Sequence, residues 1–470
     1  MRAGVAGVRR VGLRLGLRIG VRVGERRAVQ VGARLTGLIA ALLAALAVAP
    51  SHAFKIDPWS YRPPGISPQR LEAQVETFIR NPRMLVLGPI AFGTRIPAAM
   101  GQLKEAVHEN LTDLSIRCAL SPLARTGTGT GAQDMISRCA GRDGALHGSA
   151  YDLSGEQQEI IRAVRFNDAP PVKLANALMT FITPSALLCG EVRVPENAGC
   201  WAMIMAHAGG LAAVDPGNAQ FSKSGNFLYR THFGDMQFMH AMAARGETLL
   251  RTQERVLLWL RFTYQVAVGE IDTGVRIDSL APEFARDILT GFEDWTVAQF
   301  FEIRSGATSE RIRRIALGAL LHTLQDSFAH GHAEREVTAP GNEARFGAIS
   351  AFLNYGCQSE EKHGEADRAA HYKWFADAAH GESSPVTLGA QVIDLVLNRK
   401  TLWNGSISGN NPAGPSVGQW ARETLFPVSA SNAARVAGAG AAFLRTRAPA
   451  ASSLAPDGPA TAPQADDCKE

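Results

Sequence analysis

The segment 308–333 constrains the fold more than any other part of the chain, because it predicts a long amphipathic helix. Apolar side chains recur there at steps of three and four residues, which places them on one helical face. They are Ile312, Ile315, Ala316, Ala319, Leu320 and Leu324. Helical patterns dominate the rest of the chain as well, and no alternation of strands and helices predicts a parallel sheet. The sequence therefore predicts an all-α fold.

The predicted helices form a single large multi-helix domain with long loops, over residues 54–447. We place the helices at 68–80, 99–117, 155–165, 172–182, 236–268, 281–304, 308–333, 363–379, 386–399 and 432–446. The long loops are expected at 122–152, which is rich in Gly, Thr and Ser, and at 403–417. Residues 448–470 are mainly Ala, Pro and Ser with little to bury, so we expect a disordered tail.

Residues 1–53 form a basic leader that ends in an apolar segment. The leader holds nine arginines and a single acidic residue, whereas residues 35–53 are uncharged. A basic start, an apolar core and small residues at positions 51 and 53 are typical of a secretory signal peptide. We therefore expect cleavage near Ala53 and a secreted or periplasmic protein. The alternative is a helix that anchors the chain in a membrane, which Pro50 and His52 disfavour.

The net charge of the part expected to fold is mildly acidic. The leader contributes +8 to an overall formal charge of +4, which leaves −4 for residues 54–470. Proteins that bind nucleic acid usually present a basic surface to the phosphates. The charge balance therefore disfavours nucleic acid as the partner.

The six cysteines of the chain are compatible with export. Cys189 and Cys200 flank a loop that contains glycine and proline, and they predict one local disulfide. Cys118 and Cys139 are a second candidate pair. None of the cysteines has zinc-finger spacing. Buried free thiols are the alternative if the chain stays in the cytoplasm.

The strongest chemical signal is a histidine and an aspartate one turn apart within the predicted helix 308–333. His322 and Asp326 are separated by four residues, so they lie on the same helical face. A neutral imidazole and a carboxylate there can bind a cation such as zinc. His363 and Asp367 repeat the spacing. For either pair alone, a solvated or hydrogen-bonded His–Asp pair is the alternative.

These pairs belong to an ordered series of histidines and aspartates. The series is His108, Asp168, His232, His322, Asp326, His332, His363 and Asp367. Over roughly residues 100–380 it resembles the superfamily of zinc-dependent phospholipases C and single-strand-specific nucleases. Its His–x3–Asp–x5–His and later His–x3–acid motifs both have counterparts here, and His232-Phe233 is similar to its earlier His-Phe ligand step. The sequence of residues 322–330, His-Thr-Leu-Gln-Asp-Ser-Phe-Ala-His, resembles the bacterial phospholipase branch more than the nucleases.

The resemblance implies two or three clustered zinc ions. The implied ligands are Asp168, His232, His322 and Asp326 for the first ion, His332, His363 and Asp367 for the second, and Asp326, His108 and the mature N-terminal residue for the third. In the family that terminal residue is a tryptophan, whereas cleavage after Ala53 would leave Phe54 here. The third ion would then be bound differently or be absent. Asp168 could act as a base in addition to binding metal.

The implied function is that of a secreted, zinc-dependent phospholipase C. Metal-activated water would hydrolyse a phospholipid at a membrane surface to diacylglycerol and a phosphorylated headgroup. No Gly-x-Ser-x-Gly nucleophile motif occurs in the chain. One alternative is a single-strand nuclease or broad phosphodiesterase on the same metal core. The other is a non-catalytic secreted helical protein with structural metals.

Several polar residues near the motifs allow more than one interpretation. On an unbroken helix His330 lies nearer the face of His322 than His332 does, but the family spacing selects His332. We expect His240 to pack within a helix formed by 238–242, and His371 is a candidate partner of a metal ligand. A further residue, Asp235, is expected to cap a helix that starts near Met236.

Overall fold

Helices account for most of the residues whose structure is described. The computed structural model describes residues 107–120, 153–170, 227–302, 306–337, 346–358, 363, 384–409, 412–438 and 440. These residues all belong to one compact unit of the chain, Ala45–Glu470. Of them, 57% are helical and 9% are in strands, which confirms the prediction of a largely helical fold. None of these helices is long and apolar enough to cross a membrane.

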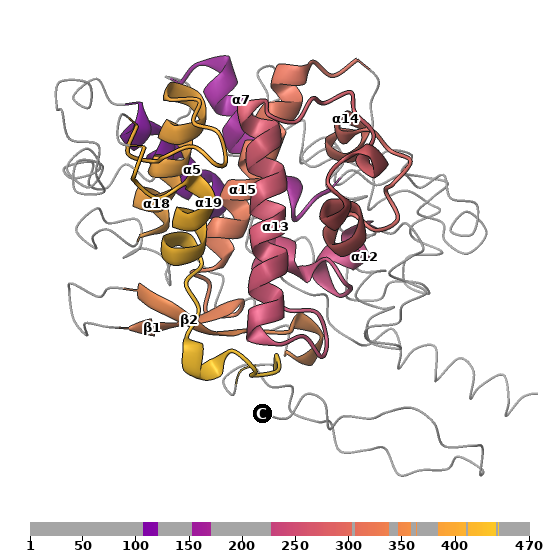
Figure 1. Ribbon diagram of the computed structural model, residues 1–470, viewed down its shortest axis with the longest axis vertical. Coiled ribbons are helices and arrows are strands. Elements are labelled where there is room, and N and C mark those ends of the chain that lie inside the picture. Colours follow the sequence, from indigo (N-terminus) through magenta and orange to yellow (C-terminus); the bar gives the residue numbers. More distant parts are fainter. Residues whose placement is uncertain are drawn as a thin grey trace, which may run out of the picture. The chain divides into compact units, whose positions relative to one another are not determined.

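Two long helices, α13 (Leu249–Val268) and α15 (Ser309–Asp326), pack against each other at the centre of the fold (Figure 1). Each begins at a threonine whose side chain accepts a hydrogen bond from a backbone N–H of the first turn, Thr248 for α13 and Thr308 for α15. Helix α13 ends at Gly269, whose φ of 89° is in the left-handed region that glycine tolerates.

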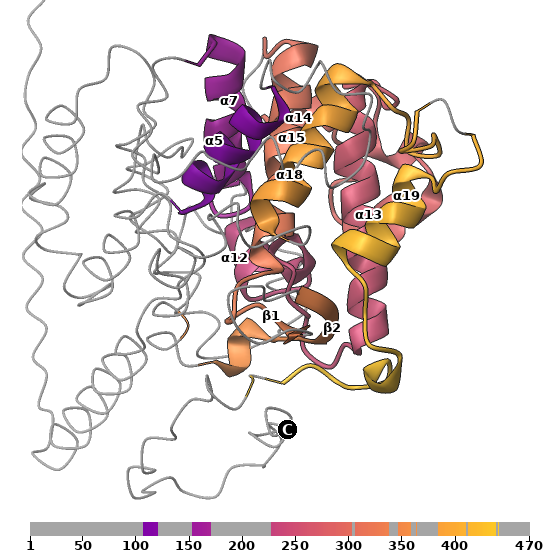
Figure 2. The same ribbon diagram turned by 90° about the vertical axis from the view of Figure 1, so that its left-hand side faces the viewer.

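Helix α15 is covered on its other sides by α5 (Val107–Ala119), α7 (Gly155–Ala163) and α18 (Pro385–Ile393). Figure 2 shows α5 and α7 on the opposite side of α15 from α13. Because of this cover, every residue of α15 from 316 to 326 is buried. The histidine and aspartate of its motif therefore lie inside the protein.

Gly318 allows α15 and the end of α7 to approach closely. A Cβ atom at this position would lie 2.4 Å from the backbone carbon of Ala163, which is much shorter than a van der Waals contact. The short 3-10 turn η4 (Val164–Phe166) follows α7 at this crossing. The crossing thus brings the backbone of η4 against the face of α15 that carries the motif.

The remaining described helices are short. They are α12 (Phe227–His232), η5 (Gln237–His240), η6 (Ile277–Ser279), η7 (Phe284–Ile288), α14 (Val297–Phe301), η8 (Tyr355–Cys357), η10 (Asp394–Asn398), α19 (Val417–Trp420), η11 (Ala421–Leu425) and η12 (Ala430–Asn432). Aromatic side chains join several of them to α13. The ring of Phe300, for example, lies 5.1 Å from Phe227 and 6.0 Å from Phe262 between ring centroids.

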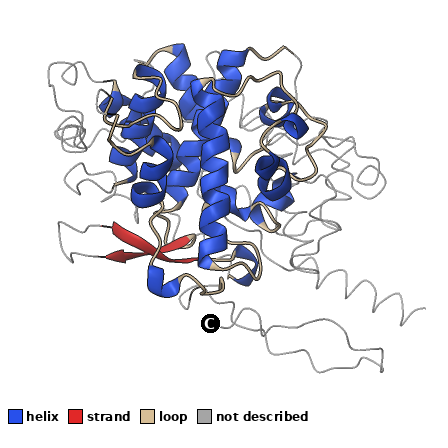
Figure 3. Cartoon of the chain, in the orientation of Figure 1, coloured by secondary structure: helices blue, strands red, loops and turns tan. Residues whose placement is uncertain are grey.

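A two-stranded antiparallel sheet corrects the all-α prediction (Figure 3). Strands β1 (Ala333–Val337) and β2 (Phe346–Phe352) pair with two register shifts. Contacts with distant residues hold them: Arg335 donates hydrogen bonds to the carbonyl oxygens of Ser327 and Leu425. Strands this short depend on such tertiary contacts, which no local pattern in the sequence reveals.

Several predicted helices end earlier than expected or are interrupted. The predicted helix 236–268 splits into η5 and α13, and 281–304 is replaced by a π-helical turn at 284–288 followed by α14. The predicted helix 308–333 ends at Asp326, and residues 433–438 of the last predicted helix are not helical.

Other predictions lie outside the described residues. These are the leader 1–53, the helices 68–80 and 172–182, the loop 122–152, the tail 448–470, and the helix 363–379 apart from His363. Both predicted disulfides include residues outside the described ranges, so these pairings remain predictions.

Candidate metal centre

The predicted ligands that fall within the described ranges converge inside the helical core. They are His108, Asp168, His232, His322, Asp326, His332 and His363, and each is at most 2% exposed. They come from α5, the turn after η4, α12, α15, the turn before β1 and the isolated described position 363. The eighth predicted ligand, Asp367, lies outside the described residues, as does His371.

His322 and Asp326 form the centre of the cluster, one turn apart on α15. The distance between His322 Nε2 and Asp326 Oδ2 is 2.9 Å. On the other side of the ring, His322 Nδ1 lies 2.7 Å from the carbonyl oxygen of Val164 in η4. A carbonyl can only accept a hydrogen bond, so Nδ1 carries the hydrogen and Nε2 of the neutral ring presents a lone pair.

His108 reaches the same carboxylate from α5. Its ring stacks on His322 with ring centroids 3.9 Å apart, and its Nε2 lies 3.4 Å from Asp326 Oδ1. Its Nδ1 is 2.7 Å from the side-chain oxygen of Gln325. The amide nitrogen of Gln325 donates to Thr112, which fixes the amide so that its oxygen faces the imidazole. His108 therefore also directs Nε2 towards the carboxylate.

His232 and Asp168 lie on another side of His322. His232 Nδ1 is 3.1 Å from the carbonyl oxygen of Leu228, one turn earlier on α12. Its Nε2 is 3.8 Å from Asp168 Oδ1, and Asp168 Oδ2 is 3.9 Å from His322 Nδ1. The neighbouring Asn167 holds this turn in place, because its side chain donates to the carbonyl oxygen of Met239 over 2.6 Å.

His332 and His363 form the third side of the cluster. His332 Nδ1 is 2.7 Å from the carbonyl oxygen of His240 and 3.6 Å from Asp326 Oδ2. The rings of His332 and His363 have centroids 4.9 Å apart. His363 Nδ1 bonds the side-chain oxygen of Gln358, whose amide nitrogen donates to the carbonyl oxygen of Gly331.

His240 is a functional candidate that the sequence analysis missed. Instead of packing within a helix of 238–242, it ends the short turn η5, and its side chain is buried in the cluster at 1% exposure. Its Nδ1 lies 2.9 Å from Asp326 Oδ2. A histidine in an otherwise apolar segment was the available signal, because a buried imidazole needs a polar partner. The expected cap is also wrong, since Asp235 instead forms two hydrogen bonds with Arg230.

Because of where α15 ends, His332 lies in the cluster and His330 does not. The helical-wheel argument for His330 assumed an unbroken helix, but α15 ends at Asp326 and the chain turns before β1. His332 is 1% exposed and faces the cluster, whereas His330 is exposed.

We expect His332→Ala to lower the zinc content of the purified protein, whereas His330→Ala should leave it unchanged. The reason is that His332 is buried within the cluster, whereas the side chain of His330 is exposed. Zinc per chain, measured by atomic emission after dialysis, checks this difference, with circular dichroism to confirm that both variants fold. Equal zinc content in the two variants would contradict it.

Burial keeps the imidazoles neutral. It lowers the pKa of His108, His232 and His363 from 6.5 to about 3. The pKa values of His240 and His322 are also well below 6.5, chiefly through burial and then through neighbouring imidazoles. Neutral imidazole is the form that binds metal, so at neutral pH these histidines are in the protonation state that a metal ion requires.

The donor atoms of the cluster fit a metal ion. In three groups the ligand atoms lie within 4.8 Å of one another: His108, His322 and Asp326; Asp168, His240 and His322; and His240, Asp326 and His332. Imidazole nitrogen together with carboxylate oxygen is a donor set that suits zinc. The buried His and Asp groups could therefore hold a metal ion.

Gly331 provides a specific test of the geometry around His363. A Cβ atom on Gly331 would lie 2.7 Å from His363 Nδ1, so Gly331→Ala must displace that ring. Because changes that disturb the orientation of a ligand typically weaken metal binding by about 10–100-fold, we expect a loss of this order for one ion in a chelator competition titration. Gly155→Ala is the matched control, since a Cβ there meets nothing within 4 Å. Unchanged affinity in Gly331→Ala would contradict a role for His363 at this position.

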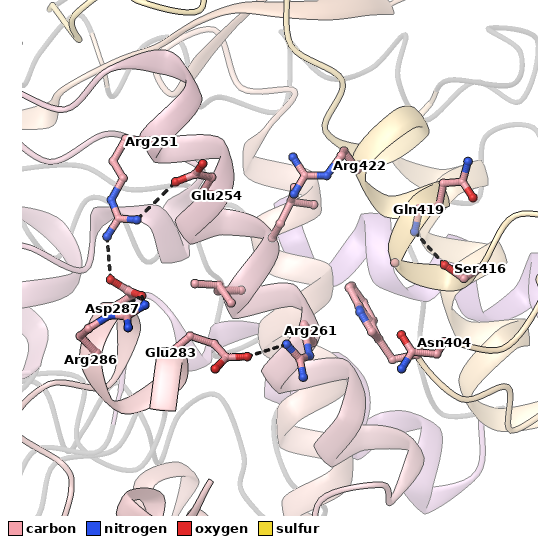
Figure 4. A pocket seen from close by; sticks show the side chains of 14 residues that line it. Arg251, Glu254, Arg261, Glu283, Arg286, Asp287, Asn404, Ser416, Gln419 and Arg422 are labelled. Atoms are coloured by element: carbon pink, nitrogen blue, oxygen red, sulfur yellow. Dashed lines mark hydrogen bonds and ion pairs between the residues drawn. The ribbon is translucent and has the colours of Figure 1, made fainter. Parts of the chain in front are cut away.

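A separate open groove of about 620 Å³ lies along the solvent-facing stripe of α13 (Figure 4). Its charged side chains largely pair with one another: Arg251 with Asp287 at 2.8 Å, and Arg261 with Glu283 at 2.9 Å. No histidine is among the described residues that line it. None of the seven buried ligand candidates lines this groove.

The chain matches no protein-family model, no curated protein and no solved structure.

Proposed function

We propose that the chain is a zinc-dependent phosphodiesterase that acts as a phospholipase C. The observation that carries the proposal is shared by the five described imidazoles of the predicted series. Each has its Nδ1 against an oxygen atom of Leu228, Val164, His240, Gln325 or Gln358. Histidines that bind metal usually donate their other ring N–H in this way, which fixes the ring and its tautomer.

The residues of the cluster would hold the metal and position the reacting groups. His108, His322 and His332 surround the Asp326 carboxylate, which can serve two ions because both of its oxygens face imidazoles. We assign Asp168 the role of a base in addition to that of a ligand, because its carboxylate lies at the edge of the cluster between His232 and His322. Bound zinc would supply water that ionises near pH 7 and would offset charge on the phosphoryl group.

Phosphodiesters are the substrate class that the family resemblance implies, and the net charge favours phospholipid over nucleic acid. A nuclease would attract its polyanionic substrate with a basic surface, whereas residues 54–470 carry a formal charge of −4. A structural metal centre is the second candidate. It is favoured by the near-complete burial of the ligands, since Asp326 is 0% and Asp168 1% exposed.

Metal content and hydrolysis assays on the purified chain test these functions together. We expect bound zinc and hydrolysis of phosphatidylcholine vesicles to diacylglycerol, lost with a chelator and restored by zinc. Preferential cleavage of single-stranded DNA would indicate the nuclease instead. Zinc-loaded protein that is inactive on both substrates, and that unfolds on chelation, would support the structural role.

A further inference from the structure

The ring nitrogen of His240 closes a triangle of donor atoms at the centre of the cluster. His240 Nδ1 is 3.1 Å from His322 Nε2 and 2.9 Å from Asp326 Oδ2. The third side, from His322 Nε2 to Asp326 Oδ2, is also 2.9 Å. His232, the imidazole that the family resemblance assigns to this ion, has its nearest described carboxylate contact at 3.8 Å, to Asp168.

The size of this triangle suits one shared cation. Zinc–nitrogen and zinc–oxygen bonds of about 2.0–2.1 Å in a tetrahedral site place neighbouring donor atoms about 3.3 Å apart. The three observed distances are close to this value. Asp168 belongs with His240 and His322 to a group whose donor atoms lie within 4.8 Å, and it offers a fourth donor.

A hydrogen bond within this triangle serves only one of its three contacts well. His322 Nδ1 donates to the carbonyl oxygen of Val164, so Nε2 of the neutral ring carries a lone pair. This lone pair faces a lone pair of Asp326 Oδ2, and the two repel each other. A hydrogen on His240 Nδ1 can point to only one of these two acceptors well. One cation between the three atoms removes the repulsion and satisfies each of them.

The surroundings of His240 agree with a placed ligand rather than a packing residue. Its Nδ1 lies within 3.1 Å of two polar atoms of the cluster, whereas its Nε2 is buried and has no hydrogen-bond partner among the described residues, so Nδ1 is the nitrogen that meets the cluster. Its backbone carbonyl receives the bond from His332. The next residue, Ala241, has a φ of 48°, a left-handed conformation that non-glycine residues rarely adopt.

We propose that His240 binds, through Nδ1, the metal ion that His322 and Asp326 share. This inference rests on the proposed metal centre and adds to it a ligand that the family resemblance does not supply. The ion would then have two imidazole nitrogens and one or two carboxylate oxygens around it. The turn η5 would be part of the metal centre, so this ion would tie α15 to the segment between α12 and α13.

The test is zinc binding by the full processed chain, measured by competition with a chromophoric chelator at pH 7.5. We expect His240→Ala to lower the affinity for one ion at least about 100-fold, more than the loss typical of residues that only orient a ligand. His330→Ala, which removes an exposed histidine, is the control and should match the wild type. Wild-type affinity in a folded His240→Ala variant would overturn the inference and leave the rest of the metal centre intact.

A second measurement decides the matter if His240→Ala does not fold. Anomalous scattering at the zinc edge from crystals of the wild-type protein would locate each ion directly. An ion about 2.1 Å from His240 Nδ1 would support the inference, and ions bound only by other residues would overturn it. A wild-type chain that binds no zinc in either experiment would overturn both this inference and the proposed function.

Discussion

Replacing Asp326 with asparagine is expected to remove bound zinc and nearly all hydrolytic activity while leaving the helix content close to that of the wild type. Asp326 is fully buried, and its carboxylate contacts more imidazoles than any other described acidic side chain. Those imidazoles are His108, His240, His322 and His332, at 3.4, 2.9, 2.9 and 3.6 Å. One carboxylate therefore connects three sides of the cluster.

The amide of asparagine has nearly the same shape but different chemistry. It carries no negative charge, and one of its two polar atoms is an NH₂ group that donates hydrogen bonds and does not bind zinc. The loss of a shared ligand should reduce activity by at least about 1,000-fold, or about 4 kcal/mol of transition-state stabilisation. Helix α15 should persist, because its cap at Thr308 and its packing against α13 do not involve the carboxylate.

Zinc content, phosphatidylcholine hydrolysis and far-ultraviolet circular dichroism on the same preparation check this expectation. Asp287→Asn is the matched control, since Asp287 is an acidic residue in the separate groove beside α13 and pairs with Arg251. It should keep full zinc and full activity. An Asp326→Asn protein with wild-type zinc and activity would rule out the shared-ligand role.

The local sequence pattern was sufficient to find α15 and the position of its two candidate ligands. A helical period of apolar residues fixes which side chains share a face, so His322 and Asp326 follow from spacing alone. The order of the other candidate ligands along the chain identified residues from α5, α12 and the turn before β1 that the fold brings together. The coarse architecture was predictable for the same reason, because long amphipathic helices must cover one another.

The sequence pattern failed where tertiary contacts decide the backbone. The predicted helix 236–268 is interrupted at Ala241, and its neighbours are held by distant residues: Asn167 bonds Met239, and Asn354 bonds Ala243. These bonds turn His240 into the cluster. No helical or strand period encodes them, because each joins residues more than 70 positions apart.

The end of α15 was hidden for a similar reason. Ser327 follows the last helical residue, and its backbone carbonyl and hydroxyl both accept from Arg335 in β1. These bonds link the helix end to a strand that no local signal predicted. The turn, and not helical spacing, determines that His332 is buried in the cluster while His330 is exposed.

Acid is expected to destabilise the metal-free protein strongly. The pKa of His108, His232 and His363 is about 3 in the folded state, against 6.5 for an exposed imidazole. Below pH 6.5 the unfolded chain binds protons that the folded chain excludes, so the contribution of each histidine to stability is complete above pH 6.5. It is lost as the pH falls towards 3.

The size of the effect follows from the same linkage. Each of the three histidines should lower the free energy of unfolding by about 2 kcal/mol between pH 7 and pH 5, or about 6 kcal/mol together. This is a large part of the roughly 5–15 kcal/mol by which domains are usually stable. His240 and His322, whose pKa values are also lowered by burial, act in the same direction.

Urea unfolding of the chelator-treated chain at about pH 7, 6 and 5 measures how the free energy of unfolding depends on pH. In the variant His363→Gln the slope below pH 6.5 should be shallower by about 1.4 kcal/mol per pH unit, because one proton-excluding site is gone. Zinc should restore stability near pH 7 and do so progressively less as acid protonates the released ligands. A free energy of unfolding that stays constant from pH 7 to pH 5 would contradict this prediction. It would mean that the imidazoles take up protons as readily in the folded protein as in the unfolded chain.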